Sequence, residues 1–237
     1  MDVESIVANI DADLRSHAIP GRADKEKAYL KSALVHYGTS MPQIRAVAKR
    51  IRAAHTFDHD QLVAVVHALW DQPVHERRAT ASVLLDLYGE RLGTADMALL
   101  ESLLRQSRTW ALVDILAVSV VGPIVERHPP AAEVLDEWAV DDDFWIRRSA
   151  LLALLLALRR GGGDFERFGR YADALLEDRE FFVRKAIGWV LRDTARRRPD
   201  VVFEWLLPRA NRASGVTLRE AVKPLTEEQR HAILAAR

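Results

Sequence analysis

DDDFWIRRSALLAL (residues 141–154) and DREFFVRKAIGWVL (residues 178–191) are two versions of one pattern, placed 37 residues apart. Each begins with acidic residues, continues with an aromatic pair, a branched residue and two cationic residues, and ends in an apolar run. Acidic side chains stabilise helix N-termini because they cap the first N–H groups and interact favourably with the helix dipole. Both stretches are therefore predicted to be helices that begin at the acids, and their recurrence predicts a repeat protein.

Weaker copies extend this pattern over most of the chain. They keep either the cap and a pair of arginines or the branched residue followed by arginine, and they are DQPVHERRATASVLL (71–85), MPQIRAVAKRI (41–51) and VTLREAVKPL (216–225). An acidic cap with Val-Arg or Ile-Arg at the start of a helix resembles the HEAT-type helical repeat. This resemblance implies helix pairs stacked into a curved α-solenoid with one concave face.

The rest of the sequence supports an all-α fold. Apolar residues recur every three or four positions, and short Gly, Pro or Asp clusters separate the segments. No stretch alternates convincingly with period two, and no linker is long enough to mark a domain boundary. We therefore expect about a dozen helices in a single HEAT-like domain over residues 1–237.

Composition excludes several classes of protein. There is no cysteine, so disulfides and thiolate metal sites are excluded. The apolar run 150–158 is too short to cross a bilayer, and we recognise no signal-peptide pattern within the sequence. With 34 basic and 34 acidic residues, the formal net charge is zero and does not indicate a nucleic-acid partner. Only the distribution of charge along the chain can indicate one. We expect a cytoplasmic bacterial monomer with no membrane partner.

One position of the repeat differs in charge between the copies. When Trp110 is aligned with Phe144, Asp114 falls opposite Arg148, and the equivalent positions of the other copies hold Arg78 and Lys185. Trp110 precedes Asp114 by four residues, so the indole and the carboxylate share one helix face. The sequence thus predicts a single acid in a groove of cations, although a structural ion pair is the alternative interpretation.

The helix that contains Lys185 carries a cationic and aromatic stripe. Lys185, Trp189, Arg192 and Arg196 follow at i, i+4, i+7 and i+11. Basic residues interleaved with aromatics suit a phosphate backbone and its adjacent sugars or bases. A solvated helix face and a core tryptophan are the alternative interpretations of the same spacing.

From about Tyr29 to about Lys223 the chain resembles the AlkD-type DNA alkylation repair glycosylases, which have a HEAT-like fold. The segments that carry this resemblance are Trp110-x-x-x-Asp114, Trp145-x-x-Arg148, FFVRKAIGWVLR (181–192), PDVV (199–202) and REA (219–221). The family implies excision of cationic N3- and N7-alkylated purines, such as 3-methyladenine and 7-methylguanine, from double-stranded DNA. Members of the family excise the base without flipping the lesion into a pocket. Such an enzyme can also accept large lesions, so bulky N3-adenine adducts are further possible substrates.

The resemblance also implies roles for individual residues. Asp114 would be the catalytic carboxylate, with Trp110 and Trp189 beside the lesion and Arg148 on the phosphate backbone. Arg148 is also expected to favour the ionised form of Asp114. The remaining expected DNA contacts are Tyr29, Arg45, Arg78, Lys185, Arg192 and Arg196.

Two departures from the family concern DNA contacts and not the chemistry. The family's polar contacts before Arg45 are replaced by Ser40 and Met41, and a second tryptophan beside Trp110 is replaced by Thr109 and Ala111.

We expect no cofactor and no metal. His55 and His59 have i, i+4 spacing, but HTFDHD (55–60) is typical of a turn between helices, and no third ligand is evident.

Two further functions fit the same groove. One is self-resistance, in which an antibiotic producer removes bulky minor-groove adducts. The other is a non-catalytic HEAT-type module that binds nucleic acid or protein.

Overall fold

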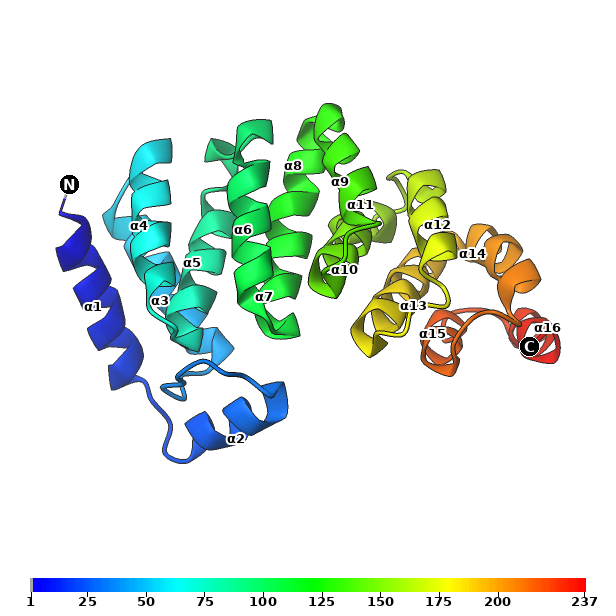
Figure 1. The fold of residues 1–237 in the computed structure, drawn as a ribbon, viewed down its shortest axis with the longest axis horizontal. Helices are drawn as coiled ribbons and strands as arrows, with labels where there is room; N and C mark the ends of the chain where they lie inside the picture. Colours follow the sequence, from blue (N-terminus) through cyan, green and yellow to red (C-terminus); the bar gives the residue numbers. More distant parts are fainter. Residues whose placement is uncertain (1) are drawn as a thin grey trace.

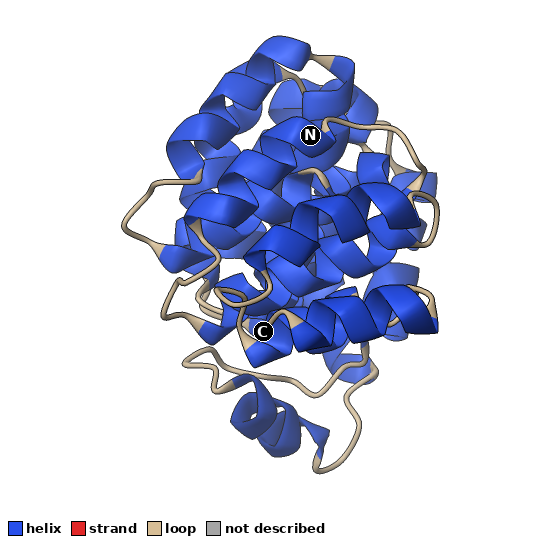
Figure 2. Ribbon diagram, turned by 90° about the vertical axis from the view of Figure 1, so that its right-hand side faces the viewer, coloured by secondary structure: helices blue, strands red, loops and turns tan. Residues whose placement is uncertain are grey.

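The computed structural model describes residues 2–237, and across them the chain forms a curved row of helices without a strand (Figures 1 and 2). The first half contains α1 (Val3–Ser16), α2 (Arg22–Leu30), α3 (Met41–Ala54), α4 (His59–Asp71), α5 (His75–Leu87), α6 (Met97–Ser107), α7 (Trp110–Asp114) and α8 (Gly122–Arg127). The second half contains α9 (Ala132–Trp138), α10 (Phe144–Ala153), α11 (Leu155–Arg159), α12 (Phe165–Ala174), α13 (Phe181–Ala195), α14 (Pro199–Leu206), α15 (Gly215–Ala221) and α16 (Glu227–Ala235). The all-α prediction is confirmed.

Sixteen α-helices in residues 2–237 exceed the expected dozen because several predicted helices are interrupted. Thus 110–127 divides into α7, the π-helical stretch Ile115–Val121 and α8, and 144–159 divides into α10 and α11. Apolar periodicity continues across such a break, so it does not reveal the boundary.

The repeat is visible in the polar contacts between successive units. Several side-chain hydrogen bonds join residues 35–37 positions apart in the chain: Glu101–Trp138, Arg105–Asp141, Asp136–Tyr171 and Asp173–Arg209. This separation is close to the 37 residues between the two copies of the motif. Each unit therefore contacts the next through the same kind of bond, as expected for a solenoid whose repeats touch mainly their neighbours.

The helix α2 protrudes from the row as an arm (Figure 1). A parallel bridge between Val35 and Val74 ties the segment after α2 to the start of α5. The buried carboxylate of Glu76 accepts hydrogen bonds from the backbone N–H groups of Tyr37, Gly38 and Thr39. The arm is thus anchored at its C-terminal connection, while its outer face remains exposed.

No helix in the described part of the chain combines the length and the apolar character needed to cross a membrane.

Candidate active site

Asp114 lies at the end of α7, and Arg148 of α10 donates two parallel hydrogen bonds to its carboxylate. Nε and Nη2 of Arg148 lie 2.8 and 2.9 Å from the two carboxylate oxygens. The remaining nitrogen, Nη1, donates to the backbone carbonyl of Phe182. The Arg148 side chain is only 3% exposed, and that of Asp114 is 16% exposed. A bidentate arginine fixes both the position and the orientation of a carboxylate.

A π-helical stretch, Ile115–Val121, directly follows Asp114 and joins α7 to α8. The N–H of Gly122 donates to the carbonyl of Ala117, five residues back, and Pro123 then has no N–H to donate. A π turn inserts an extra residue into the helix, so the side chains on either side of it are re-aimed relative to one another. Pro123 inside an apolar helical pattern is the sequence signal from which this break was predictable.

Gly122 allows α10 to approach this helix closely. A Cβ atom at residue 122 would lie 2.6 Å from the backbone oxygen of Ala153, which belongs to the same helix as Arg148. The glycine therefore permits the approach that places Arg148 next to Asp114.

We expect Gly122→Ala to destabilise the protein by about 1–3 kcal/mol, because overpacking against backbone forces the two helices apart. Urea unfolding of both proteins measures the difference. Gly89→Ala is the matched control, since its Cβ would meet no heavy atom within 4 Å. Equal stability of the two variants would contradict the close approach.

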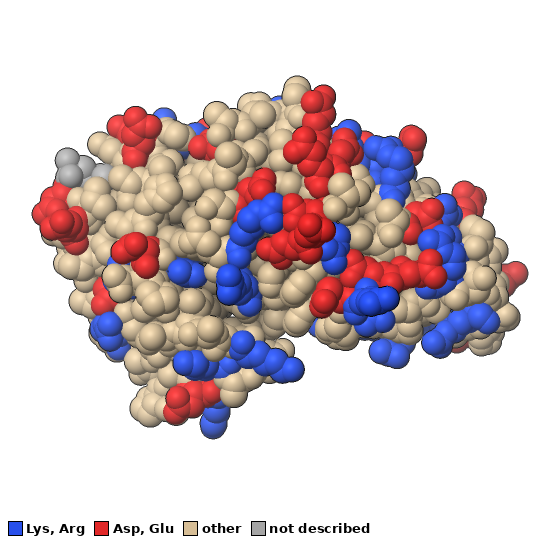
Figure 3. All heavy atoms as spheres, in the orientation of Figure 1, with Lys and Arg blue, Asp and Glu red and all other residues tan. Residues whose placement is uncertain are grey.

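Aromatic side chains surround the carboxylate and form a hollow of about 370 Å³. It is lined by Tyr29, Trp110, Asp114, Arg148, Phe181, Phe182, Lys185 and Trp189. Tyr29, on the arm, meets Trp110 edge to face with ring centroids 6.0 Å apart, and it is 74% exposed. The surface is indented between the arm and the C-terminal helices in the view of Figure 3. Residues from α2, α7, α10 and α13 thus converge, although they span more than 150 positions of the chain.

Burial and charge act in opposite directions on Asp114. Burial raises the pKa of Asp114 above its ordinary value, while the charges of Arg148 and Lys185 oppose the shift. Arg148 therefore favours the ionised form of Asp114, as expected, but it does not offset the whole effect of burial. Withdrawal of the carboxylate from water is the larger effect.

Trp189 is held by Asp193, one helical turn further along α13. Oδ2 of Asp193 accepts hydrogen bonds from the indole N–H of Trp189 at 3.1 Å and from Arg159 at 2.6 Å. Oδ1 accepts from Arg192 at 3.2 Å. Arg159 and Arg192 keep the pKa of the buried Asp193 below its ordinary value against the effect of burial. Asp193 was not predicted from the sequence, although its i, i+4 spacing from Trp189 was a usable signal.

We expect Asp193→Ala to lower the free energy of unfolding by about 1–3 kcal/mol, because the indole N–H and two arginines lose their shared acceptor. Since the folded pKa lies below the ordinary value of 3.8, this stabilisation is complete above pH 3.8 and disappears as pH falls through the folded pKa. Glu126→Ala is the control, because the Glu126–Arg160 pair also joins residues 34 apart but is half exposed. Denaturation of the wild type and the two variants at neutral and acidic pH measures these losses of stability. Equal losses in Asp193→Ala and Glu126→Ala would contradict the role assigned to Asp193.

The expected cations do not form one continuous stripe. Arg78 is buried, and its guanidinium donates to the backbone carbonyls of Trp70 and Gln106. Arg192 is paired with Glu220 as well as Asp193. Lys185 and Arg196 are exposed. The structure therefore brings Lys185 into the hollow, whereas Arg78 and Arg192 are engaged in contacts within the protein.

Arg45 lies away from the hollow. Its side chain is 47% exposed, and Nη1 is 4.0 Å from Asp86. The aromatic pair Phe181–Phe182 belongs to the repeat pattern and to the segment that resembles the family, but it was not predicted as part of the site. It also lines the hollow. Helix α2, which contributes Tyr29 to the hollow, also carries the cations Arg22, Lys25 and Lys27 and ends at the cap residue Lys31.

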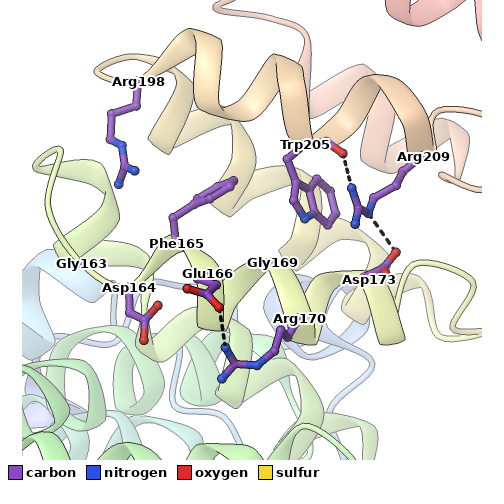
Figure 4. A pocket seen from close by; sticks show the side chains of 10 residues that line it. All are labelled: Gly163, Asp164, Phe165, Glu166, Gly169, Arg170, Asp173, Arg198, Trp205 and Arg209. Carbon is purple, nitrogen blue, oxygen red and sulfur yellow. Dashed lines mark hydrogen bonds and ion pairs between the residues drawn. The ribbon is translucent and has the colours of Figure 1, made fainter.

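A larger hollow of about 590 Å³ lies between α12 and α14 (Figure 4). Its aromatic faces are already covered, since the guanidinium of Arg209 lies 4.7 Å from the ring centre of Trp205 and that of Arg198 lies 5.6 Å from that of Phe165. Arg209 also pairs with Asp173. The polar groups of this hollow are engaged with one another, unlike the open aromatic rim around Asp114.

Comparison with solved structures gives the same architecture. A predicted DNA alkylation repair enzyme from Enterococcus faecalis superposes with a TM-score of 0.79 at 24% identity, covering 89% of this chain and 98% of that one. AlkD2 from Streptococcus mutans gives a TM-score of 0.60 at 17% identity, covering 94% and 99%. The protein smu.31 from Streptococcus mutans UA159 gives 0.60 at 18% identity, covering 78% and 93%.

At these identities the likeness shows the fold. No curated protein matches the chain. Residues 10–225, however, match the family described as "DNA alkylation repair enzyme". The chain therefore belongs to the DNA alkylation repair enzyme family, and the AlkD-type resemblance of its sequence is confirmed.

Proposed function

We propose that this family member is a DNA glycosylase that hydrolyses the N-glycosidic bond of cationic N3- and N7-alkylated purines in double-stranded DNA and so initiates base excision repair. The observation that carries the proposal is the carboxylate of Asp114, fixed by a buried arginine within an open, aromatic-lined hollow. A fixed carboxylate beside aromatic faces suits a reaction in which positive charge develops on a sugar.

The chemistry needs few groups. An alkylated purine that already carries positive charge leaves with the electron pair of the C1′–N bond and needs no proton from a general acid. The sugar then becomes oxocarbenium-like, and the charge of Asp114 stabilises it because the carboxylate is oriented before the reaction. Water adds to C1′, and its proton passes to Asp114 or to solvent. The products are the free alkylated base and an abasic site.

The aromatic residues would contact the lesion nucleotide. Trp110 and Trp189 would offer their ring faces to the cationic sugar or base, an interaction worth roughly 0.5–2 kcal/mol. Tyr29 approaches the same hollow from the arm. The hollow opens beside exposed rings, which suits a nucleotide that stays in the duplex, so we propose catalysis without base flipping.

The structure suggests a changed role for Arg148. Its guanidinium is buried and all three of its nitrogens are directed at Asp114 and Phe182, so we propose that it positions the carboxylate instead of holding a phosphate. Lys185 and Arg196, which are exposed, are the proposed phosphate contacts on α13, with Arg45 as a more distant one.

Release of 7-methylguanine and 3-methyladenine from alkylated duplex DNA tests the proposal. We expect chromatography to detect both free bases in the presence of the wild-type protein. DNA binding without any base release would instead indicate a non-catalytic module. A parallel duplex with a bulky N3-adenine adduct separates general repair from self-resistance, since only the latter would spare the methylated bases.

We expect base release to rise with pH through the pKa of Asp114, because only the ionised carboxylate stabilises a cationic sugar. Burial places this rise above the ordinary carboxyl value of 3.8. Lys185 lowers the pKa of Asp114, so Lys185→Met should move the rise to higher pH. Single-turnover rates over about pH 4–8 measure both, with the exposed Lys49→Met as control. An unmoved profile in Lys185→Met would count against Asp114 as the titrating group.

A further inference from the structure

A cluster of two histidines and a glutamate lies where the arm joins the body. Glu26 belongs to α2, His36 follows that helix, and His75 is the first residue of α5. One possible ligand atom from each of the three side chains lies within 4.8 Å of the other two. None of these residues lines the hollow around Asp114. The three residues come from separate segments, so no local motif in the sequence predicts the cluster.

The cluster contains a concentration of buried polar atoms without a hydrogen-bond partner in the protein. They are Oε2 of Glu26, both ring nitrogens of His36, Nδ1 of His75, Oε2 of Glu76 and Nε of Arg22. The His36 side chain is 1% exposed, and His75 is 3% exposed. Buried polar groups are nearly always hydrogen-bonded in folded proteins. Such a concentration indicates a shared ligand, and all of these atoms except Nε of Arg22 can offer it a lone pair.

The chemistry of the cluster suits a divalent transition metal. Burial lowers the pKa of His36 and lowers that of His75 to about 3, so both rings remain neutral near neutral pH. Neutral imidazole nitrogen is the form that binds metal, and two histidines with one carboxylate form a donor set typical of zinc. Glu76 adds a second buried negative charge beside the donors.

The geometry requires one adjustment. The rings of His36 and His75 are stacked, with centroids 4.6 Å apart and planes inclined by 7°. A metal ion binds in the plane of an imidazole, so one ring must turn about χ2 before both rings can share an ion. His36 can turn without breaking a hydrogen bond, because neither of its nitrogens has a partner in the protein. Its Nδ1 already lies 3.8 Å from Oε2 of Glu26.

An ion also has a route to the cluster. Glu26 borders an open hollow of about 460 Å³ together with Arg22, Lys25 and Tyr29. The carboxylate of Glu26 therefore faces both this hollow and the buried histidines, and its exposed fraction of 16% agrees with that position.

We propose that Glu26, His36 and His75 bind one divalent transition-metal ion of the zinc type, which fastens the arm to the body of the solenoid. The ion would link α2 to the start of α5, next to the existing bridge between Val35 and Val74. Tyr29 follows Glu26 by three residues on the same helix, so the ion would also steady Tyr29. That last consequence rests on the proposed function, whereas the metal site itself does not.

Titration of the metal-free full-length protein with Zn²⁺ tests the site. We expect calorimetry to show one bound ion per chain and thermal unfolding to shift to higher temperature. His36→Ala and His75→Ala should each weaken binding by at least about tenfold, the lower end of what even a ligand's supporting partner contributes. His59→Ala is the control, because this histidine is half exposed and paired with Asp60 and Asp96 outside the cluster.

Absence of Zn²⁺ binding, or binding that survives both substitutions, would overturn the proposal. If a variant fails to fold, the visible absorption spectrum of Co²⁺ added to the wild-type protein tests the site instead. Intense visible absorption from imidazole-ligated, low-coordinate Co²⁺ supports the site, and the spectrum of the hydrated ion refutes it. These measurements do not depend on base release, so failure of the metal site and failure of the glycosylase proposal are separable.

Discussion

Asp114→Asn is expected to reduce release of 7-methylguanine from alkylated duplex DNA by about 10²–10³-fold, the usual cost of removing one preorganised electrostatic group. The asparagine keeps nearly the same shape but carries no charge to stabilise the oxocarbenium-like sugar. It also leaves the buried guanidinium of Arg148 without its counter-charge. Single-turnover base release, measured with saturating enzyme, isolates the chemical step from binding.

Asp178→Asn is the matched control for this experiment. Asp178 is also an arginine-paired, largely buried aspartate, bonded to Arg147 at 2.8 Å, but it does not line the hollow. If both variants lose stability but only Asp114→Asn loses base release, the loss of activity is due to catalysis and not to folding. Full activity of Asp114→Asn on every alkylated purine would refute the assignment of the carboxylate, and binding of undamaged duplex should be similar in both variants.

Arg148→Met is expected to destabilise the protein by about 3–5 kcal/mol, because it leaves Asp114 as a buried charge without a partner. The carbonyl of Phe182 loses a donor in the same variant. Without Arg148 the folded-state pKa of Asp114 should rise further, since one opposing charge is gone. The destabilisation is therefore expected at neutral pH and should shrink as pH falls through that raised pKa, where the folded state becomes protonated.

A double-mutant cycle measures this coupling. Asp114→Asn/Arg148→Met should be more stable than Arg148→Met alone, because no unpaired charge remains in the double variant. Arg160→Met is the control for loss of an arginine, and the half-exposed pair of Arg160 with Glu126 should be worth about 1 kcal/mol or less. Strict additivity of the two substitutions would show that the pair is not coupled.

The network around Trp189 illustrates why part of the site was not predictable. The i, i+4 relation of Trp189 to Asp193 is local and was available from the sequence. The third partner, Arg159, lies on α11, 34 residues away from Asp193. Only the packing of α11 against α13 makes these groups neighbours. The same reason applies to the arm, whose Tyr29 meets Trp110 across 81 positions of the chain.

The sequence by itself determined the all-α class, the repeat of about 37 residues and the pairing of Trp110 with Asp114 on one face. These features depend on capping residues, helical periodicity and i, i+4 spacing, which act within a single helix. Only the tertiary structure decided that Arg148 is buried against Asp114, that Arg78 is engaged with backbone carbonyls, and that burial outweighs charge in setting the pKa of Asp114. The reason is physical: desolvation and ion pairing depend on every group packed around a side chain, and those groups come from helices far apart in the chain.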